Sequence, residues 1–181
     1  DSIGPDFGKP PTPRCRSAYR SDMAIRSRLS AADLCTSLLA VHKPDTPFVV
    51  RDGRAEGVDL IAELRFQDKT WNDLFRGVGL SRAYTIRMRI DESNAEVRKK
   101  EKLGDIGWRD GEHYAKRFGA TNTEFGEISE TIYAATYARK GLFKFEKETE
   151  FRFKTADLRD PLVRAIYRAG WECRNVTFRK L

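Results

Sequence analysis

The feature of this sequence that most constrains its fold is a strict alternation of apolar and polar side chains beside one polar turn. Over residues 84–91, large apolar side chains occupy every even position and polar side chains every odd one. The turn is predicted at Asp91 to Asn94, after which the chain returns through Ala95 and Val97. This pattern is typical of a β-hairpin with one apolar face. Such a face must be covered by another layer of structure.

Three segments carry apolar side chains at helical spacing and are predicted to supply that layer. They are residues 30–41, 69–78 and 156–169. Ser30 can accept a hydrogen bond at the start of the first helix. Gly79 and Gly170 follow the second and third helices, and glycine adopts the left-handed conformation that ends many helices. For the third helix, Asp160 is expected to cap the start and Pro161 to lie in the first turn.

Further strands are predicted around the hairpin. They comprise residues 48–50, 58–66, 131–137, 143–153 and 171–178, and residues 112–118 are expected to form a short helix. The sequence therefore predicts a single α+β domain over residues 30–181, in which a largely antiparallel sheet packs against three amphipathic helices. A partly closed, barrel-like sheet is the alternative, because long strands would otherwise leave exposed edges.

Residues 1–29 differ in composition and are predicted to form an extended N-terminal arm. They hold four of the seven prolines, and their basic side chains exceed their acidic ones by three, out of a net charge of +7 for the chain. A segment of this kind buries too little apolar surface to fold by itself. Its arginines are candidates for contacts with a partner: Arg14, Arg16, Arg20, Arg26 and Arg28.

The polar face of the hairpin is the second candidate surface. With the turn at residues 91–94, Arg87 faces Arg98 and Thr85 faces Lys100. Like charges directly opposite each other destabilise a sheet, and an anion bound over them relieves the repulsion. The candidate residues here are Arg87, Arg89, Arg98 and Lys100. The alternative is a solvated face whose charges protect the sheet from edge pairing.

The chain is poor in the residues that carry out catalysis. It has two histidines, and Cys35 and His42 lie seven residues apart on a predicted helix, beyond hydrogen-bond reach. A calcium loop is excluded because Glu96 and Lys102 stand where that motif needs glycine and glutamate. No glycine-rich phosphate-binding motif occurs. We therefore expect no enzyme activity, no cofactor and no metal.

The cysteines and the hydropathy pattern bear on the compartment. Cys15, Cys35 and Cys173 form neither a C-x-x-C pair nor an even set. We expect free thiols in a reducing intracellular compartment, either the cytoplasm or the interior of an organelle, with any targeting segment already removed. The longest apolar stretches are a few residues long, far short of the roughly 20 that cross a bilayer.

These observations leave three hypotheses for the function. The first is a non-enzymatic accessory or scaffold subunit, which binds other protein subunits of a larger assembly through the arm and the hairpin face. The second is a basic module that binds nucleic acid, RNA in particular, with an affinity that falls steeply with salt. The third is peripheral attachment to an anionic membrane.

Overall fold

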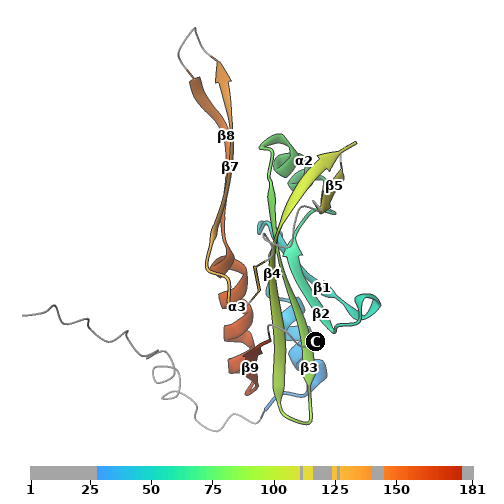
Figure 1. Cartoon of the computed structure of the whole chain (residues 1–181). Coiled ribbons are helices and arrows are strands. Elements are labelled where there is room, and N and C mark those ends of the chain that lie inside the picture. The colour runs from blue at the N-terminus through green and yellow to red at the C-terminus, as the bar shows by residue number, and fades with distance from the viewer. Residues whose placement is uncertain (1–27, 111, 116–123, 126, 140–144, 177–181) are drawn as a thin grey trace, which may run out of the picture.

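The fold is built on a seven-stranded, mostly antiparallel sheet (Figure 1). The computed structural model describes residues 28–110, 112–115, 124–125, 127–139 and 145–176. Five strands follow one another across the sheet: β1 (Phe48–Asp52), β2 (Leu60–Leu64), β3 (Arg82–Asp91), β4 (Glu96–Arg109) and β5 (Glu112–Ala115). Two short strands also pair with β4, namely β6 (Glu124–Phe125) and β9 (Glu172–Asn175), and only β9 is parallel to it. The described strands form an open sheet, so the barrel-like alternative is not supported.

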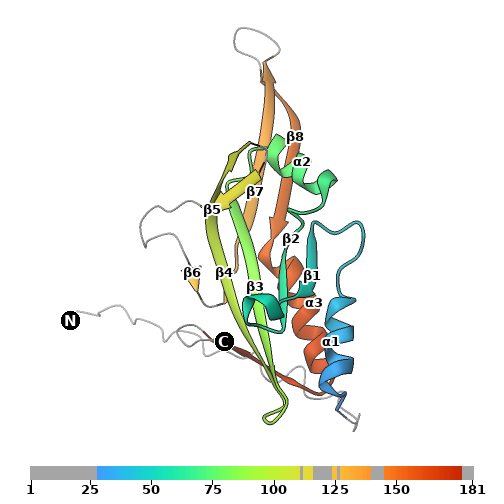
Figure 2. The same ribbon diagram turned by 90° about the vertical axis from the view of Figure 1, so that its right-hand side faces the viewer.

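Two helices, α1 (Ala31–Leu39) and α3 (Thr155–Arg168), cover one face of the sheet (Figures 1 and 2). We call this the inner face. The short 3-10 helix η1 (Arg54–Glu56) lies on the opposite, outer face. The alternation in β3 explains the core, because Tyr84, Ile86 and Met88 are fully buried on the inner face. They belong to one cluster with apolar side chains of both helices, Leu34, Leu38, Leu158, Leu162 and Ile166.

The three predicted amphipathic helices are all present, and three of their boundaries follow the predicted signals. The hydroxyl of Ser30 accepts a hydrogen bond from the backbone N–H of Asp33 at 3.1 Å. Gly79 follows α2 (Lys69–Gly77) with a φ of 64°, and Gly170 follows α3 with a φ of 79°. Both glycines therefore adopt the left-handed conformation expected at a helix end.

The predicted range of α3 agrees with the structure to within one residue, but the predicted cap at Asp160 is wrong. The helix begins at Thr155, and Pro161 lies inside it and not in its first turn. The carboxylate of Asp157 accepts a hydrogen bond from the backbone N–H of Lys154 at 3.2 Å, so the helix is capped six residues before Asp160. Burial of Leu158 extends the apolar stripe of the helix over the turn before Asp160.

The predicted helix over residues 112–118 is also wrong, since residues 112–115 form β5. Tyr114 pairs with Gly107 of β4, and a Cβ atom at Gly107 would lie 2.7 Å from its ring. The preceding residue, His113, stacks on Phe66 with ring centroids 3.9 Å apart. These cross-strand contacts stabilise β5 as a strand, and the local sequence does not reveal them.

The remaining strands, β7 (Thr131–Arg139) and β8 (Phe145–Lys154), form a separate two-stranded sheet. This hairpin begins beside the N-terminal end of α3 and extends in the direction opposite to that in which the helix runs (Figure 1). The sequence predicts both strands but places them in one sheet with the others. Most of the predicted arm, residues 1–27, lies outside the described residues.

Candidate binding surfaces

The register of the β3–β4 hairpin differs from the predicted one. Asp91 pairs with Glu96, so the loop comprises residues 92–95. The carboxylate of Asp91 accepts hydrogen bonds from the hydroxyl of Ser93 at 2.6 Å and the backbone N–H of Asn94 at 3.2 Å. Ala95 then closes the loop with a φ of 53°. These local contacts favour a loop shifted by one residue from the prediction.

The predicted Arg87–Arg98 pair is therefore wrong. Arg89 faces Arg98, and Arg87 faces Lys100. Because the shift changes the pairing by two residues, the same side chains still share one face of the sheet. The structure thus places all four candidate residues of the hairpin on the outer face, with two pairs of facing cations in place of one.

The outer face carries more positive than negative side chains. The strand register gives seven cations on this face: Arg51, Arg87, Arg89, Arg98, Lys100, Lys102 and Arg174. The carboxylates beside them are Glu56, Glu63, Asp91, Glu96 and Glu172. Seven cations and five carboxylates leave a net charge of +2.

Ion pairs hold several of these cations in position. Arg87 donates to Glu56 at 2.8 Å. Arg98 contacts Asp91 at 2.5 Å and Glu96 at 2.9 Å. A guanidinium has five N–H donors, and these contacts use only part of them. The counter-ions therefore relieve the repulsion between the cations within the protein itself and fix the direction of their side chains.

The same contacts shift the pKa values of the carboxylates. Hydrogen bonds from Ser93 and Asn94 lower the pKa of Asp91 to about 2. The hydrogen bond from Arg51 is the main reason that the pKa of Glu56 lies below its usual value. Both groups are therefore charged near neutral pH.

Between the hairpin and η1 the face forms a shallow hollow of about 370 Å³, lined by Glu56, Glu63, Thr85, Arg87, Lys100 and Lys102.

Of the candidate residues in the predicted arm, only Arg28 lies in the described part of the chain. Its guanidinium carbon is 5.2 Å from the centroid of the Trp171 ring. The indole N–H of Trp171 donates to the carbonyl of Leu29 at 2.9 Å, and the N–H of Leu29 donates to the carbonyl of Ala169 at 3.0 Å. Arg28 thus helps to fix the start of the domain beside the end of α3. Arg14, Arg16, Arg20 and Arg26 lie outside the described residues.

The inner face also holds a buried polar cluster that the sequence analysis did not predict. Glu101 is fully buried and accepts hydrogen bonds from the hydroxyl of Tyr84 at 2.6 Å and the backbone N–H of Ile128 at 2.9 Å. Its other carboxylate oxygen pairs with Lys99. The signal was present, since Lys99 and Glu101 share the parity of the buried Val97. This cluster joins β4 to the segment before β7.

Burial and the neighbouring charges also control the acidity of two groups near this cluster. Desolvation, together with the hydrogen bond to Glu101, raises the pKa of Tyr84. Desolvation raises the pKa of Cys173 to about 11, so its thiol is protonated at neutral pH. The nucleophile of a cysteine is its thiolate, and burial here disfavours that form.

Both histidines also make structural contacts. Nδ1 of His42 accepts a hydrogen bond from the backbone N–H of Val50 at 3.3 Å, and His113 stacks on Phe66. Within the described residues, no group of three or more His, Cys, Asp or Glu side chains is placed to hold a metal ion. No helix in this part of the chain has the length and apolar character needed to span a membrane.

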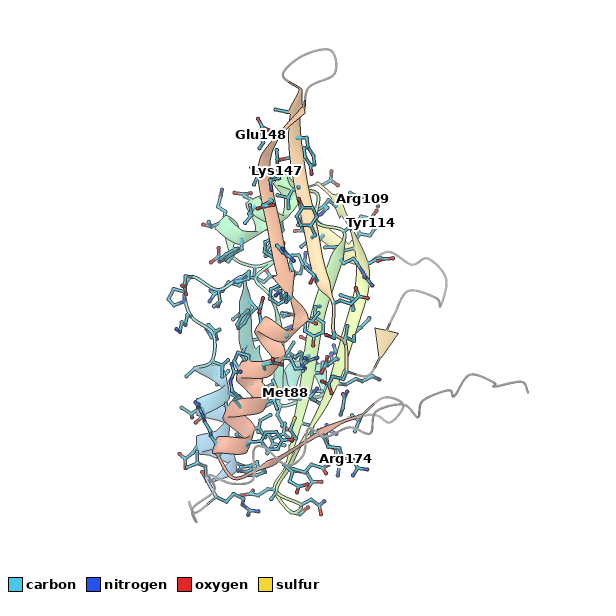
Figure 3. All side chains as sticks on the ribbon, turned by 90° about the vertical axis from the view of Figure 1, so that its left-hand side faces the viewer. Met88, Arg109, Tyr114, Lys147, Glu148 and Arg174 are labelled. Carbon is cyan, nitrogen blue, oxygen red and sulfur yellow. The ribbon has the colours of Figure 1, made fainter. Side chains whose placement is uncertain are left out.

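At the outer end of β4, Arg109 lies 5.4 Å from the ring centroid of Tyr114 on β5 (Figure 3). This cation–π contact lies at the opposite end of β4 from the loop of the β3–β4 hairpin.

Comparison of the chain with protein-family models, with curated proteins and with solved structures found no match. The site must therefore be interpreted from its own geometry.

Proposed function

We propose that this protein is a non-enzymatic accessory subunit that binds a protein partner through the outer face of its sheet. The observation that carries the proposal is two pairs of facing cations, Arg89 with Arg98 and Arg87 with Lys100, in which the protein's own carboxylates hold Arg87 and Arg98 in place. Preoriented donors cost less conformational entropy when a partner binds. A rigid sheet face of this kind suits a specific interface.

The mixture of charges favours a protein partner over a nucleic acid. A phosphate backbone is recognised by cations with few nearby carboxylates, because each contact neutralises a phosphate and releases a counter-ion. Five carboxylates stand among the seven cations of this face. A protein surface with a complementary arrangement of acidic and basic groups matches that pattern, and such complementarity determines specificity.

The proposal is tested by removing two cations and measuring the mass of the complex. The variant R87Q/K100Q removes two facing cations of the outer face, and K69Q/R76Q removes two exposed cations from α2 as a matched control. Tagged protein is purified from its native source, treated with nuclease and analysed by size-exclusion chromatography with light scattering. Wild-type protein and K69Q/R76Q should elute well above the 20.8 kDa of the chain, and R87Q/K100Q close to it.

Wild-type protein that elutes as a monomer only after nuclease treatment would overturn the proposal and favour the nucleic-acid module. If R87Q/K100Q still forms the complex, the outer face is not part of the interface. The arm is tested separately by deletion of residues 1–27, and we propose that its arginines Arg14, Arg16, Arg20 and Arg26 add contacts to the same assembly. The deletion should weaken assembly and leave the thermal unfolding of the domain unchanged.

A further inference from the structure

A groove on the other side of the molecule is lined by α3, the end of β8 and the loop between α1 and β1. Its volume is about 770 Å³, which is within the range of ligand-binding clefts. It extends along α3 from Asp157 to Arg168, a distance of about 16 Å at the rise of an α-helix. This groove is separate from the outer face of the sheet, since α3 covers the inner face.

Four cations border the groove and two carboxylates accompany them. The cations are Lys43 from the loop, Arg152 from β8, and Arg164 and Arg168 from α3; the carboxylates are Asp45 and Asp157. All four cations are exposed, and in the described part of the chain none of them forms a salt bridge. Arg164 and Arg168 are four residues apart, so they lie on one side of the helix as a like-charged pair. Four cations and two carboxylates thus leave the lining of the groove with a net charge of +2.

The floor of the groove is apolar and well packed. Phe48 and Phe153 are buried there, with ring centroids 6.4 Å apart. The rest of the apolar lining comes from Val41, Pro47, Pro161 and Ala165. Apolar side chains of a ligand could therefore lie on this floor while its anionic groups contact the cations at the border.

The loop that forms one wall is fixed by hydrogen bonds from below. The guanidinium of Arg65 donates to the carbonyl of Lys43 at 2.7 Å and to that of Phe48 at 3.0 Å. The hydroxyl of Thr46 donates to the carbonyl of Lys43 at 2.7 Å. The opposite wall is a helix. Both walls are thus ordered before a ligand binds, which reduces the entropy cost of binding.

We propose that this groove binds an extended segment of a partner protein that combines acidic and apolar side chains. Charge complementarity gives the acidic residues, and the apolar floor gives the apolar ones. A nucleic acid fits less well, because the aromatic rings of the groove are buried in its floor and cannot stack on bases. The inference is independent of the proposed function, since it concerns a different face and a different set of cations.

The experiment measures the binding of synthetic peptides by fluorescence anisotropy. One peptide repeats Glu-Leu-Ser four times, and the second repeats Glu-Ser-Ser four times, so that the two differ only in apolar side chains. Three proteins are compared with the wild type: R164Q/R168Q in the groove, K69Q/R76Q on α2 as the matched control, and R87Q/K100Q on the outer face. Each of them removes two positive charges from an exposed surface.

The wild type should bind the leucine-containing peptide at least tenfold more tightly than the serine peptide. R164Q/R168Q should weaken that binding by about tenfold or more, whereas K69Q/R76Q and R87Q/K100Q should not change it. Amide chemical shifts should move at the groove, over residues 43–48 and 152–168. If R164Q/R168Q loses peptide binding while R87Q/K100Q still assembles, this inference holds and the proposed function fails. If R164Q/R168Q still binds the peptide while R87Q/K100Q no longer assembles, the proposed function holds and this inference fails.

Three results would overturn the inference. Equal affinities for the two peptides would show that the apolar floor makes no contact. Displacement of the leucine-containing peptide by a single-stranded RNA of similar length, with shifts at the same residues, would assign the groove to a phosphate backbone. Absence of binding at millimolar peptide would likewise exclude an acidic, apolar segment as the occupant.

Discussion

The β3–β4 hairpin and the β7–β8 hairpin are both made of long antiparallel strands, but only the first has neighbours along its edges. β3 pairs with β2, and β4 pairs with β5, β6 and β9. In the described part of the chain, β7 and β8 pair only with each other. Figure 1 shows the second hairpin projecting beyond the start of α3. An isolated two-stranded hairpin is marginally stable in water, so the β7–β8 hairpin must depend on contacts at its base.

Those contacts are concentrated where β7 begins and β8 ends. Ile132 and Phe151 are buried, and the ring of Phe151 lies 4.9 Å from that of Phe75 on α2. On the opposite face of the hairpin, Tyr133 is 51% exposed near the base and Tyr137 is 58% exposed farther along. Lys147 and Glu148 lie toward the outer end of the hairpin, away from α3 (Figure 3). The comparison indicates that the stability of a hairpin is determined by its surroundings more than by its own sequence pattern.

The largest effect is expected from the buried charge pair of the β3–β4 hairpin. Replacing Glu101 with leucine leaves Lys99 buried without its counter-ion, which typically costs about 3–5 kcal/mol. The double variant K99M/E101L removes both charges and should lose less. Urea unfolding followed by tryptophan fluorescence gives both free energies of unfolding. Equal losses in the single and double variants would show that the uncompensated charge is not the cause.

A smaller and more local effect is expected at the base of the β7–β8 hairpin. Ile132→Ala removes a buried side chain and should cost about 2–4 kcal/mol within that hairpin. Hydrogen exchange should show faster exchange of amides in β7 and β8, with those of β3 and β4 unchanged. Met88→Ala, in the middle of the core, is the control and should reduce the protection of both hairpins. Loss of protection throughout the chain in I132A would make the two hairpins one cooperative unit.

The sequence predicts those parts of the fold that follow from local periodicity. The helices near residues 30–41, 69–78 and 156–169 are confirmed, as is the inner face of β3, because both follow from repeated burial on one side. The predicted cap of α3 at Asp160 was wrong because the contact of Asp157 with Lys154 outweighed the usual preference of proline for a first turn. The helix predicted over residues 112–118 was wrong because β4, the partner of residues 112–115, supplies the contacts that make them a strand.

The candidate surfaces divide in the same way. The parity of β3 and β4 correctly groups Arg87, Arg89, Arg98 and Lys100 on one face, since alternation is a local property. Their pairing was wrong by two residues because the hydrogen bonds of Asp91 determine the loop. The groove of α3 was not predicted. Its cations come from two parts of the chain that lie far apart in the sequence, the loop that holds Lys43 and the continuous stretch of β8 and α3, and only packing brings these parts together.

Removing one tyrosine hydroxyl from each hairpin compares how much such a group stabilises the fold in the two places. Tyr84→Phe removes a buried donor to Glu101 and should reduce the free energy of unfolding by about 1–3 kcal/mol. Tyr137→Phe removes the same atom from an exposed side chain and should change it by no more than about 0.5 kcal/mol. The measurement is urea unfolding of both variants under the same conditions. A loss in Y137F as large as that in Y84F would contradict the distinction between an embedded and a solvated hairpin.

The smallest expected effect distinguishes two carboxylates whose pKa values are lowered, one on each hairpin. Hydrogen bonds from Ser93 and Asn94 lower the pKa of Asp91 to about 2, whereas the contact with Lys147 lowers that of Glu150. Since each pKa is lower in the folded protein than in the unfolded chain, each carboxylate stabilises the fold above its unfolded pKa. That contribution is lost as the pH falls through the folded value.

Salt separates the two causes. The Lys147–Glu150 ion pair is exposed, so 1 M salt should screen it and return the pKa of Glu150 toward its usual value. The short hydrogen bonds at Asp91 are local and screen poorly, so its pKa should stay near 2. Carboxyl carbon chemical shifts, titrated by NMR at low and high salt, measure both values. An equal rise at Asp91 would mean that its nearby cation Arg98 holds the charge, and that the loop of the embedded hairpin is fixed by ion pairing.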